Sequence, residues 1–150
     1  MKKMLFAIVV SSLFFAGSAL ADMNVGMNSY AGVTGYDVAG YTADMTAVAP
    51  GFQMETQHGA IAGVWNGGVS ISQYTDAYRG AGVTLVSSGT EGAVNAGWWG
   101  VAGLNAGTNT NVSIPNIQAF MDGNIDLSSA FGGSASGSAS QFVVILNNAN

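Results

Sequence analysis

Residues 59–104 read GAIAGVWNGGVSISQYTDAYRGAGVTLVSSGTEGAVNAGWWGVAGL, and this stretch decides the fold. Its runs of small and β-branched residues are broken by Asn66-Gly67-Gly68 and by the segment Ser88 to Gly92, a pattern typical of successive β-hairpins. Asn and Gly tolerate the positive φ angles that tight turns require. We therefore predict two hairpins, with arms Ala60–Trp65 and Val69–Thr75 in the first and Gly80–Ser87 and Ala93–Leu104 in the second.

The flanking regions carry similar signals. Residues 23–49 predict two short strands, and Pro50-Gly51 predicts a turn. Farther along, a short helix near 115–122 competes with a hairpin that turns at Asp122-Gly123. The fold class predicted is all-β: an antiparallel sandwich or flattened barrel of short Gly/Ala/Ser-rich strands, with that one short helix as an alternative.

The first 21 residues predict a cleaved export signal. Lys2 and Lys3 precede an apolar run from Met4 to Phe15, and Ala19-Leu20-Ala21 is a small-x-small cleavage site. The apolar run is about 12 residues long, shorter than the roughly 20 that span a bilayer. Cleavage between Ala21 and Asp22 predicts a secreted or cell-surface protein, with the periplasm as the alternative location.

The charge balance of the remaining chain limits its partners. Without the leader, Arg79 is the one cation against eight acidic residues. Binding to a phosphate backbone needs several cations that release counterions. We therefore expect no nucleic-acid partner and no membrane partner. The chain has no cysteine, so its stability must come from packing, hydrogen bonds or assembly with other copies.

The mature chain divides into three parts in this interpretation. Residues 22–131 form the β domain, 132–140 a Gly/Ser flexible linker, and 141–150 a C-terminal strand and tail. The strand contains the most concentrated apolar run of the mature chain, which predicts burial on both faces. A flexible tether lets this strand pair with a neighbouring subunit or close the sheet of its own domain. The candidate assembly residues are Phe142, Val143, Val144, Ile145 and Leu146.

The sequence contains few residues of the types that carry out catalysis. His58 is the one histidine, and there is no cysteine for nucleophilic catalysis. The sequence contains neither a Gly-x-Ser-x-Gly elbow nor a His-Glu-x-x-His motif. We therefore expect no enzyme, no catalytic residues and no cofactor.

Two metal-binding patterns are weak. Asp122, Asn124 and Asp126 resemble the opening of a calcium loop, but Leu127 and Gly133 stand where that loop has glycine and glutamate. A polar turn is the favoured interpretation, and calcium binding there stays open. Methionine more often fills core gaps than binds copper, so we predict no metal site. The soft-ligand pairs considered were Met23 with Met27 and Met54 with His58.

Three tryptophans are the candidate ligand-binding residues. Trp65, Trp98 and Trp99 are of the type that stacks on sugar rings. Adjacent residues of a strand point to opposite faces, so at most one of Trp98 and Trp99 is expected on any one surface. The favoured arrangement has one tryptophan in the core and one at its rim.

These patterns predict an exported structural protein. The expected role is a self-associating subunit of an extracellular or cell-surface fibre or biofilm matrix, whose partners are other copies of itself. The alternative is a small secreted module that binds a glycan, a matrix component or a protein through exposed aromatic residues. A small outer-membrane β-barrel is a lesser alternative, because Gly, Ser and Asn on both strand faces give a poor lipid-facing band.

Overall fold

The computed structural model of the chain describes residues 7–9, 23–80 and 82–146, which form a six-stranded antiparallel sheet and contain no helix. The strands are β1 (Ala7–Val9), β2 (Met23–Ala49), β3 (Phe52–Gly80), β4 (Val83–Ile114), β5 (Ile117–Ala130) and β6 (Ser134–Leu146). The predicted all-β antiparallel fold is confirmed. The predicted cleavage site and the last four residues lie outside the described residues, as does most of the predicted export signal.

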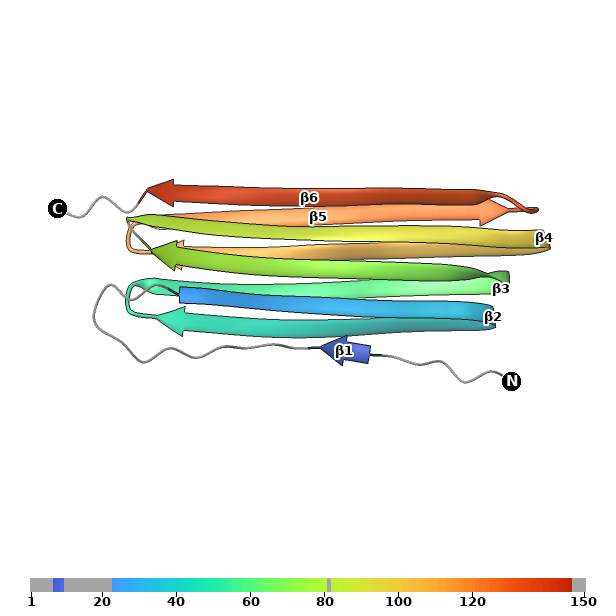
Figure 1. Cartoon of the computed structure of the whole chain (residues 1–150), viewed down its shortest axis with the longest axis horizontal. Helices are drawn as coiled ribbons and strands as arrows, with labels where there is room; N and C mark the ends of the chain where they lie inside the picture. Colours follow the sequence, from blue (N-terminus) through green and yellow to red (C-terminus); the bar gives the residue numbers. More distant parts are fainter. Residues whose placement is uncertain (1–6, 10–22, 81, 147–150) are drawn as a thin grey trace.

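Each long strand bends near its middle. The bend in β2 is marked by Gly35, with a φ of 94°, and the bend in β3 by Asn66, with a φ of 55°. In β4 the bend covers residues 97–100, which the pairing ladder with β3 skips. Glycine and asparagine adopt positive φ more readily than other residues. Figure 1 shows the three long strands doubling back at the same end of the molecule, which we call the bend end.

The bends divide the strands into two layers. The first layer contains, in spatial order, residues 23–35, 67–80, 83–96 and 134–146. The second layer contains residues 36–49, 52–65, 101–114 and 117–130. Neighbouring segments are antiparallel in both layers, and β6 pairs with the half of β4 that β5 leaves uncovered. The sheet is open, and its arrangement is a flattened two-layer sandwich.

The two hairpins predicted over residues 60–104 are wrong. The halves of β3 lie in different layers and contact each other through side chains, as His58 Nε2 and Thr75 Oγ1 do at 2.8 Å. Such a strand–bend–strand unit is a β-arch. Ser88 to Gly92 lies within β4, which begins at Val83. Asn and Gly are compatible with both a hairpin turn and a β-arch. Pairing with distant segments of the chain determines which of the two forms.

Hairpin turns occupy the opposite end of the molecule, which we call the turn end. Pro50-Gly51 joins β2 to β3 as predicted, and Pro115-Asn116 joins β4 to β5. Proline followed by a residue of positive φ, here 66° at Gly51 and 67° at Asn116, is the pattern of a type II turn. The short helix predicted near 115–122 is therefore wrong. β5 begins at Ile117, and its inward residues then recur at every second position.

The predicted Gly/Ser linker differs from the structure as well. β6 begins at Ser134, so residues 134–140 belong to a strand rather than to a tether. Small inward residues make this possible, because a Cβ at Gly137 would lie only 3.1 Å from Leu127 Cδ2. Ala135, Ala139 and Leu127 all pack against one buried apolar cluster, which includes Val64 and Leu104. β6 can therefore lie close to the second layer along its whole length.

The interior between the layers is part apolar and part hydroxyl-lined. One apolar cluster lies towards the turn end and includes Met27, Met54 and Val112, and the other lies towards the bend end and includes Val64 and Leu104. Between them, hydroxyl groups bond across the layers. Thr56 Oγ1 in the second layer lies 3.0 Å from Thr75 Oγ1 in the first, and it also lies 2.8 Å from Thr110 Oγ1 on the neighbouring strand of its own layer. These bonds satisfy polar groups that burial would otherwise penalise.

Candidate assembly edges and aromatic end

The described strands leave two sheet edges open. β2 pairs with β3 along one side, and on its other side the described residues supply only β1, which covers Asn28–Tyr30. β5 and β6 pair with β4 on one side, and no described strand lies on their other side. Each edge runs along one layer, bends, and returns along the other layer. Open edges present unpaired N–H and C=O groups to other chains.

The edges lack the usual protective residues. Natural proteins block exposed edges with lysine, proline or charged side chains that point inward. Neither β2 nor β5 nor β6 contains lysine, arginine or proline. The charges they do carry are acidic and include Asp44 on β2 and Asp122 on β5, both exposed. At either edge, these acidic side chains are therefore the main local obstacle to backbone pairing.

The predicted assembly residues lie on β6, in register with the start of β4. Phe142 to Leu146 pairs with residues 83–87 of the same chain, so one backbone side of this run is used within the subunit. Ile145 points into the core, whereas Phe142 is 78% exposed and Val144 51%. The predicted burial on both faces is therefore wrong. Inward and outward positions alternate because the run covers one face of a two-layer fold.

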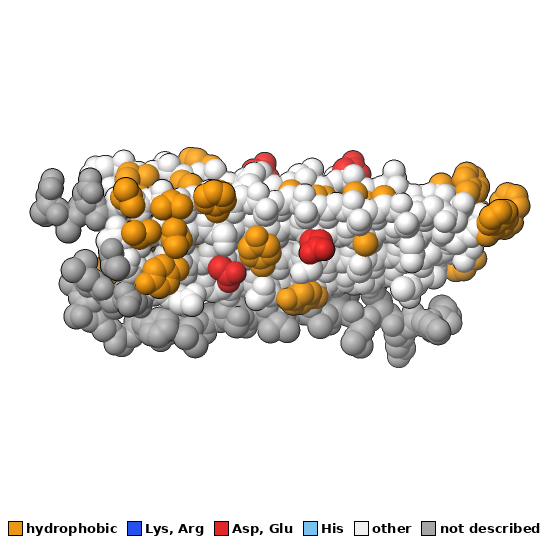
Figure 2. Space-filling model, turned by 45° about the horizontal axis from the view of Figure 1, so that its top comes forward, with side chains coloured by type: hydrophobic (Ala, Val, Ile, Leu, Met, Phe, Trp, Pro, Cys, Tyr) orange, Lys and Arg blue, Asp and Glu red, His pale blue; other side chains and the backbone are white. Residues whose placement is uncertain are grey.

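The outward residues of this run belong to an apolar patch on the first layer. Leu85 is the register partner of Val144 and also pairs with Tyr78, and both side chains are partly exposed. Figure 2 shows hydrophobic side chains gathered near one end of this face, while acidic side chains are spaced along its middle. The patch lies towards the turn end, where β6 ends.

Exposed aromatic side chains occupy the bend end. All four bends contribute, because residues 131–133 between β5 and β6 form a fourth bend beside the other three. Trp99 and Phe131 meet edge to face with ring centroids 6.4 Å apart. The exposed fractions of the set range from 58% to 76%. Its members are Tyr36, Trp65, Trp98, Trp99 and Phe131.

Glycines let these bends stack closely. A Cβ added at Gly100 would lie 2.0 Å from the carbonyl oxygen of Asn66, and one at Gly97 would lie 2.6 Å from the Asn66 side chain. On the other side, the N–H of Phe131 donates to the carbonyl of Gly100 at 2.9 Å, and that of Gly132 to Gly97 at 2.8 Å. The bends of β3, β4 and the β5–β6 connection are therefore packed side by side.

The three tryptophans share one end, contrary to the sequence interpretation. Trp65, Trp98 and Trp99 are all more than half exposed, and none of them is in the core. Trp98 and Trp99 can both be exposed because residues 97–100 form a bend outside the ladder with β3, where neither side of the chain faces the core. Tyr36 and Phe131 were missed by sequence analysis. Their position beside Gly35 and Gly132, both with positive φ, is the signal that could have placed them at bends.

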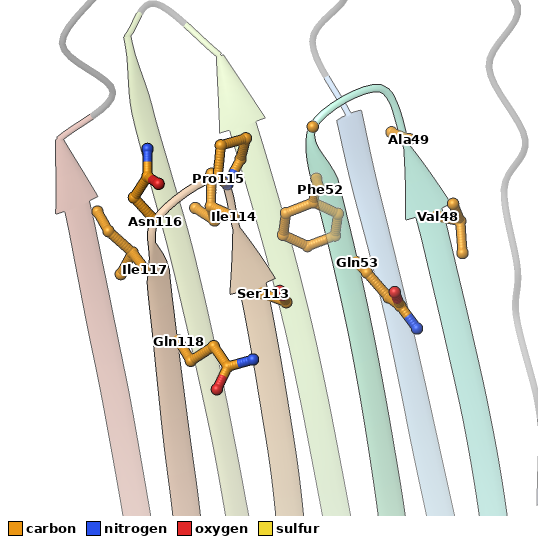
Figure 3. A pocket seen from close by; sticks show the side chains of 11 residues that line it. Val48, Ala49, Phe52, Gln53, Ser113, Ile114, Pro115, Asn116, Ile117 and Gln118 are labelled. Atoms are coloured by element: carbon orange, nitrogen blue, oxygen red, sulfur yellow. The ribbon is translucent and has the colours of Figure 1, made fainter.

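A pocket of about 740 Å³ lies at the turn end, between the turns at Pro50-Gly51 and Pro115-Asn116. Figure 3 shows its lining, with Phe52 at the start of β3 and Pro115 in the turn between β4 and β5. Amide and apolar side chains line this pocket, and no histidine or carboxylate is among them. It therefore offers no acid–base pair for hydrolysis.

The residues considered for metal binding are placed as follows. His58 and Met54 are fully buried on β3, and Met27 is fully buried on β2. Both His58 ring nitrogens lie at hydrogen-bonding distance from hydroxyls, Nδ1 at 3.0 Å from Ser29 and Nε2 at 2.8 Å from Thr75. Burial lowers the pKa of His58 to about 4. The histidine is therefore a neutral core residue at neutral pH.

Asp122, Asn124 and Asp126 lie at alternate outward positions of β5. An extended strand spaces alternate residues about 7 Å apart, whereas a calcium loop folds its ligands around one point. The polar turn expected here is a strand. Among the described residues, no three His, Cys, Asp or Glu side chains group as they would around a metal ion.

Comparisons with known proteins add no family to this description. No protein-family model matches the chain, and no curated protein is significantly similar to it. The part of the chain that the structure describes also has no helix long and apolar enough to cross a membrane.

Proposed function

We propose that the chain is an exported structural subunit that self-associates, edge to edge, into a fibre or matrix at the cell surface or outside the cell. The observation that carries this proposal is the match between the two open edges. β2 presents a bent edge of 27 residues, and the opposite edge consists of 14 residues of β5 and 13 of β6. A second copy can therefore add its β2 to β5 and β6 and continue both layers.

Strand direction supports the same arrangement. Segments alternate in direction across each layer, so residues 23–35 and 134–146 at the two edges of the first layer run in opposite directions. Residues 36–49 and 117–130 do the same in the second layer. Translation of one copy thus preserves antiparallel pairing at the junction. Such a contact does not close on itself, and it generates a linear stack.

The predicted export signal fits this proposal. β1 lies within the first 21 residues and pairs with Asn28–Tyr30 of β2. Cleavage after Ala21 removes β1 and frees the backbone groups of those three residues. The whole β2 edge is then available to a second copy.

A role without catalysis is part of the proposal. The single histidine is buried and hydrogen-bonded to Ser29 and Thr75. No carboxylate side chain lines the pocket at the turn end. The conspicuous surfaces are instead the open edges and the aromatic end, which are suited to binding other molecules rather than to catalysis.

Fibre diffraction and negative-stain imaging of purified residues 22–150 test the proposal. Each copy adds four segments to each layer. At about 4.8 Å per strand, the expected axial repeat is about 19 Å, together with the strand spacing itself. Polymers with this repeat are the expected result. A chain that stays monomeric at high concentration overturns the proposal.

Two proline variants separate edge pairing from folding. Adjacent residues of a strand direct their N–H groups to opposite sides, so Ser138→Pro and Ala139→Pro remove one N–H facing β4 and one facing outward. One variant should destabilise the subunit, because proline removes a ladder bond. The other should leave a folded monomer that cannot extend the stack. Undiminished polymerisation of both folded variants contradicts pairing through β6.

The clustered aromatic end favours a second candidate function, recognition of a neutral glycan. Trp98 and Trp99 are 76% and 73% exposed on one bend, and exposed indole rings stack well on sugar faces. The test is retention on insoluble neutral polysaccharide. Trp98→Ala and Trp99→Ala should lose retention, whereas Phe142→Ala, an exposed aromatic at the other end, should keep it. Equal retention by all three variants removes this candidate.

A further inference from the structure

We propose that the junction of the stack brings Asp122 of one copy directly opposite Asp44 of the next, and that this pair of like charges restrains assembly. The inference rests on the proposed edge-to-edge stacking and adds its register and its electrostatic control. Its starting point is one row of side chains that crosses the outer face of the second layer.

That row has acids at its two ends and amides between them. The strand registers align Asp44 with Gln57, Gln57 with Asn109, and Asn109 with Asp122. All four side chains are exposed. Gln57 Nε2 donates to Asp44 Oδ1 at 2.8 Å, so within one copy each step of the row places an amide next to an acid or another amide. Only a junction between copies can place two carboxylates side by side.

The positions of the bends determine which row of side chains in one copy lies opposite which row in the next copy. At one edge the strand turns at Gly35, and at the other edge the chain turns at residues 131–133. A shift of one residue at the junction would exchange inward and outward faces. A shift of two would set the bend of one copy against a straight segment of the next. Continuation of the existing rows avoids both mismatches.

Inward side chains agree with that register. Continuing the rows places Met121 opposite Met45 of the next copy in the second layer, and Ile145 opposite Met23 in the first. All four side chains already lie among the core clusters of the subunit. On the outer face, the large Phe142 side chain falls opposite Gly26, which has none. The apolar core of one copy is thereby continuous with that of the next.

The Asp122–Asp44 contact is the unfavourable element of this junction. Residues directly opposite each other in antiparallel strands have Cβ atoms about 5 Å apart, and like charges there are destabilising. The neighbouring side chains in the row, Gln57 and Asn109, are neutral amides, so neither compensates the two negative charges. The one described cation, Arg79, lies in the first layer and donates to the carbonyl of Pro50 at the turn end. Salt should therefore accelerate assembly by screening the pair.

Charge substitution tests the electrostatic part. At low salt, Asp44→Lys should lower the critical concentration for assembly about 2- to 10-fold, and added salt should reduce that difference. Asp44→Lys combined with Asp122→Lys restores a like-charge pair and should return the critical concentration towards the parent value. Glu91→Lys is the matched control, because it makes the same charge change on the central strand β4 of the other layer. An Asp44→Lys effect no larger than that of Glu91→Lys overturns the inference.

Disulfide trapping tests the register itself, because the chain has no cysteine of its own. Positions 44 and 122 lie on opposite edges of one subunit, too far apart for an internal disulfide, which needs Cα atoms within about 7 Å. Oxidised polymers of the Asp44→Cys and Asp122→Cys double variant should give a ladder of covalent oligomers, whereas Glu91→Cys with Asp122→Cys should not. Polymers without the ladder overturn the register alone. Absence of polymers from every variant at every salt concentration overturns stacking, and the register with it.

Discussion

His58 Nε2 lies 2.8 Å from the hydroxyl oxygen of Thr75, a contact that joins the two layers from within. The other ring nitrogen, Nδ1, lies 3.0 Å from the hydroxyl of Ser29. Burial disfavours the charged imidazolium and lowers the pKa of His58 from 6.5 to about 4. The only histidine of the chain therefore makes folding sensitive to acid.

The free energy of unfolding should fall as the pH drops from about 6.5 to about 4. In this window the unfolded chain takes up a proton on His58 that the folded chain does not. The difference between the two pKa values corresponds to at most about 3–4 kcal/mol. Urea unfolding at a series of pH values measures it, and His58→Gln should remove this part of the slope. Asp76, whose pKa burial raises, has the opposite slope and remains in both proteins. Parallel curves for parent and variant would contradict the assignment.

Gly100→Ala should lower the free energy of unfolding by about 1–3 kcal/mol, as overpacking does. The added Cβ would lie 2.0 Å from the carbonyl oxygen of Asn66 and 2.7 Å from that of Trp65, and backbone atoms cannot move away easily. Gly103→Ala is the control on the same strand, because its Cβ meets only the Leu127 carbonyl oxygen at 3.9 Å. Denaturant midpoints compare the two. Equal midpoints would mean that the bends are not closely stacked.

Substitutions at adjacent positions of β6 should have unequal effects. Ile145 is 7% exposed and points into the core, while its neighbour Val144 is 51% exposed. Ile145→Ser should cost about 2–5 kcal/mol, as loss of a buried aliphatic side chain does. Val144→Ser should cost less than about 1 kcal/mol. Thermal unfolding of monomeric protein at low concentration measures both effects. A larger effect of Val144→Ser would mean that Val144, rather than Ile145, points into the core.

Tryptophan fluorescence should report an exposed environment in the folded protein. Trp65, Trp98 and Trp99 are all at least 58% exposed. Acrylamide should therefore quench the native emission almost as efficiently as that of the urea-unfolded chain, and unfolding should shift the emission little. Native emission that resists the quencher would show that the bend end is covered. In polymers the quenching should persist, because the proposed stacking leaves this end free.

Local sequence signals predicted the strands but not the way in which they pair. Alternation at Val69, Ile71 and Gln73 correctly indicates one inward face, and Pro50-Gly51 correctly marks a turn. At Asn66, however, a hairpin and an arch both need a positive φ. Choosing between them requires knowing that β3 pairs with β2 and β4, which depends on contacts far apart in the chain. Pro115 was ambiguous for a similar reason, since proline suits both a helix start and a turn.

The candidate sites were predictable only residue by residue. The apolar composition of Phe142 to Leu146 predicted a strand but left open whether it pairs within its own subunit or with a neighbour, and the structure pairs it with β4 of the same chain. The tryptophans were recognisable as ligand-type residues. Their grouping with Tyr36 and Phe131 follows from the stacking of four bends, which no local pattern encodes. The acidic ends of the row from Asp44 to Asp122 likewise emerge only from the strand register.

The nesting of distant segments within each layer has a kinetic consequence. Met23 pairs with Arg79, and the start of β4 pairs with the end of β6. The β2–β3, β3–β4 and β4–β5 ladders can each grow from a short turn, but many of their bonds, and all of those between β4 and β6, join residues far apart in the chain. Chains dominated by such non-local pairing fold in milliseconds to seconds, far more slowly than helical bundles. For the export proposed above, slow folding would keep the chain extended during synthesis, as passage through an export channel requires, and the two layers would form after release.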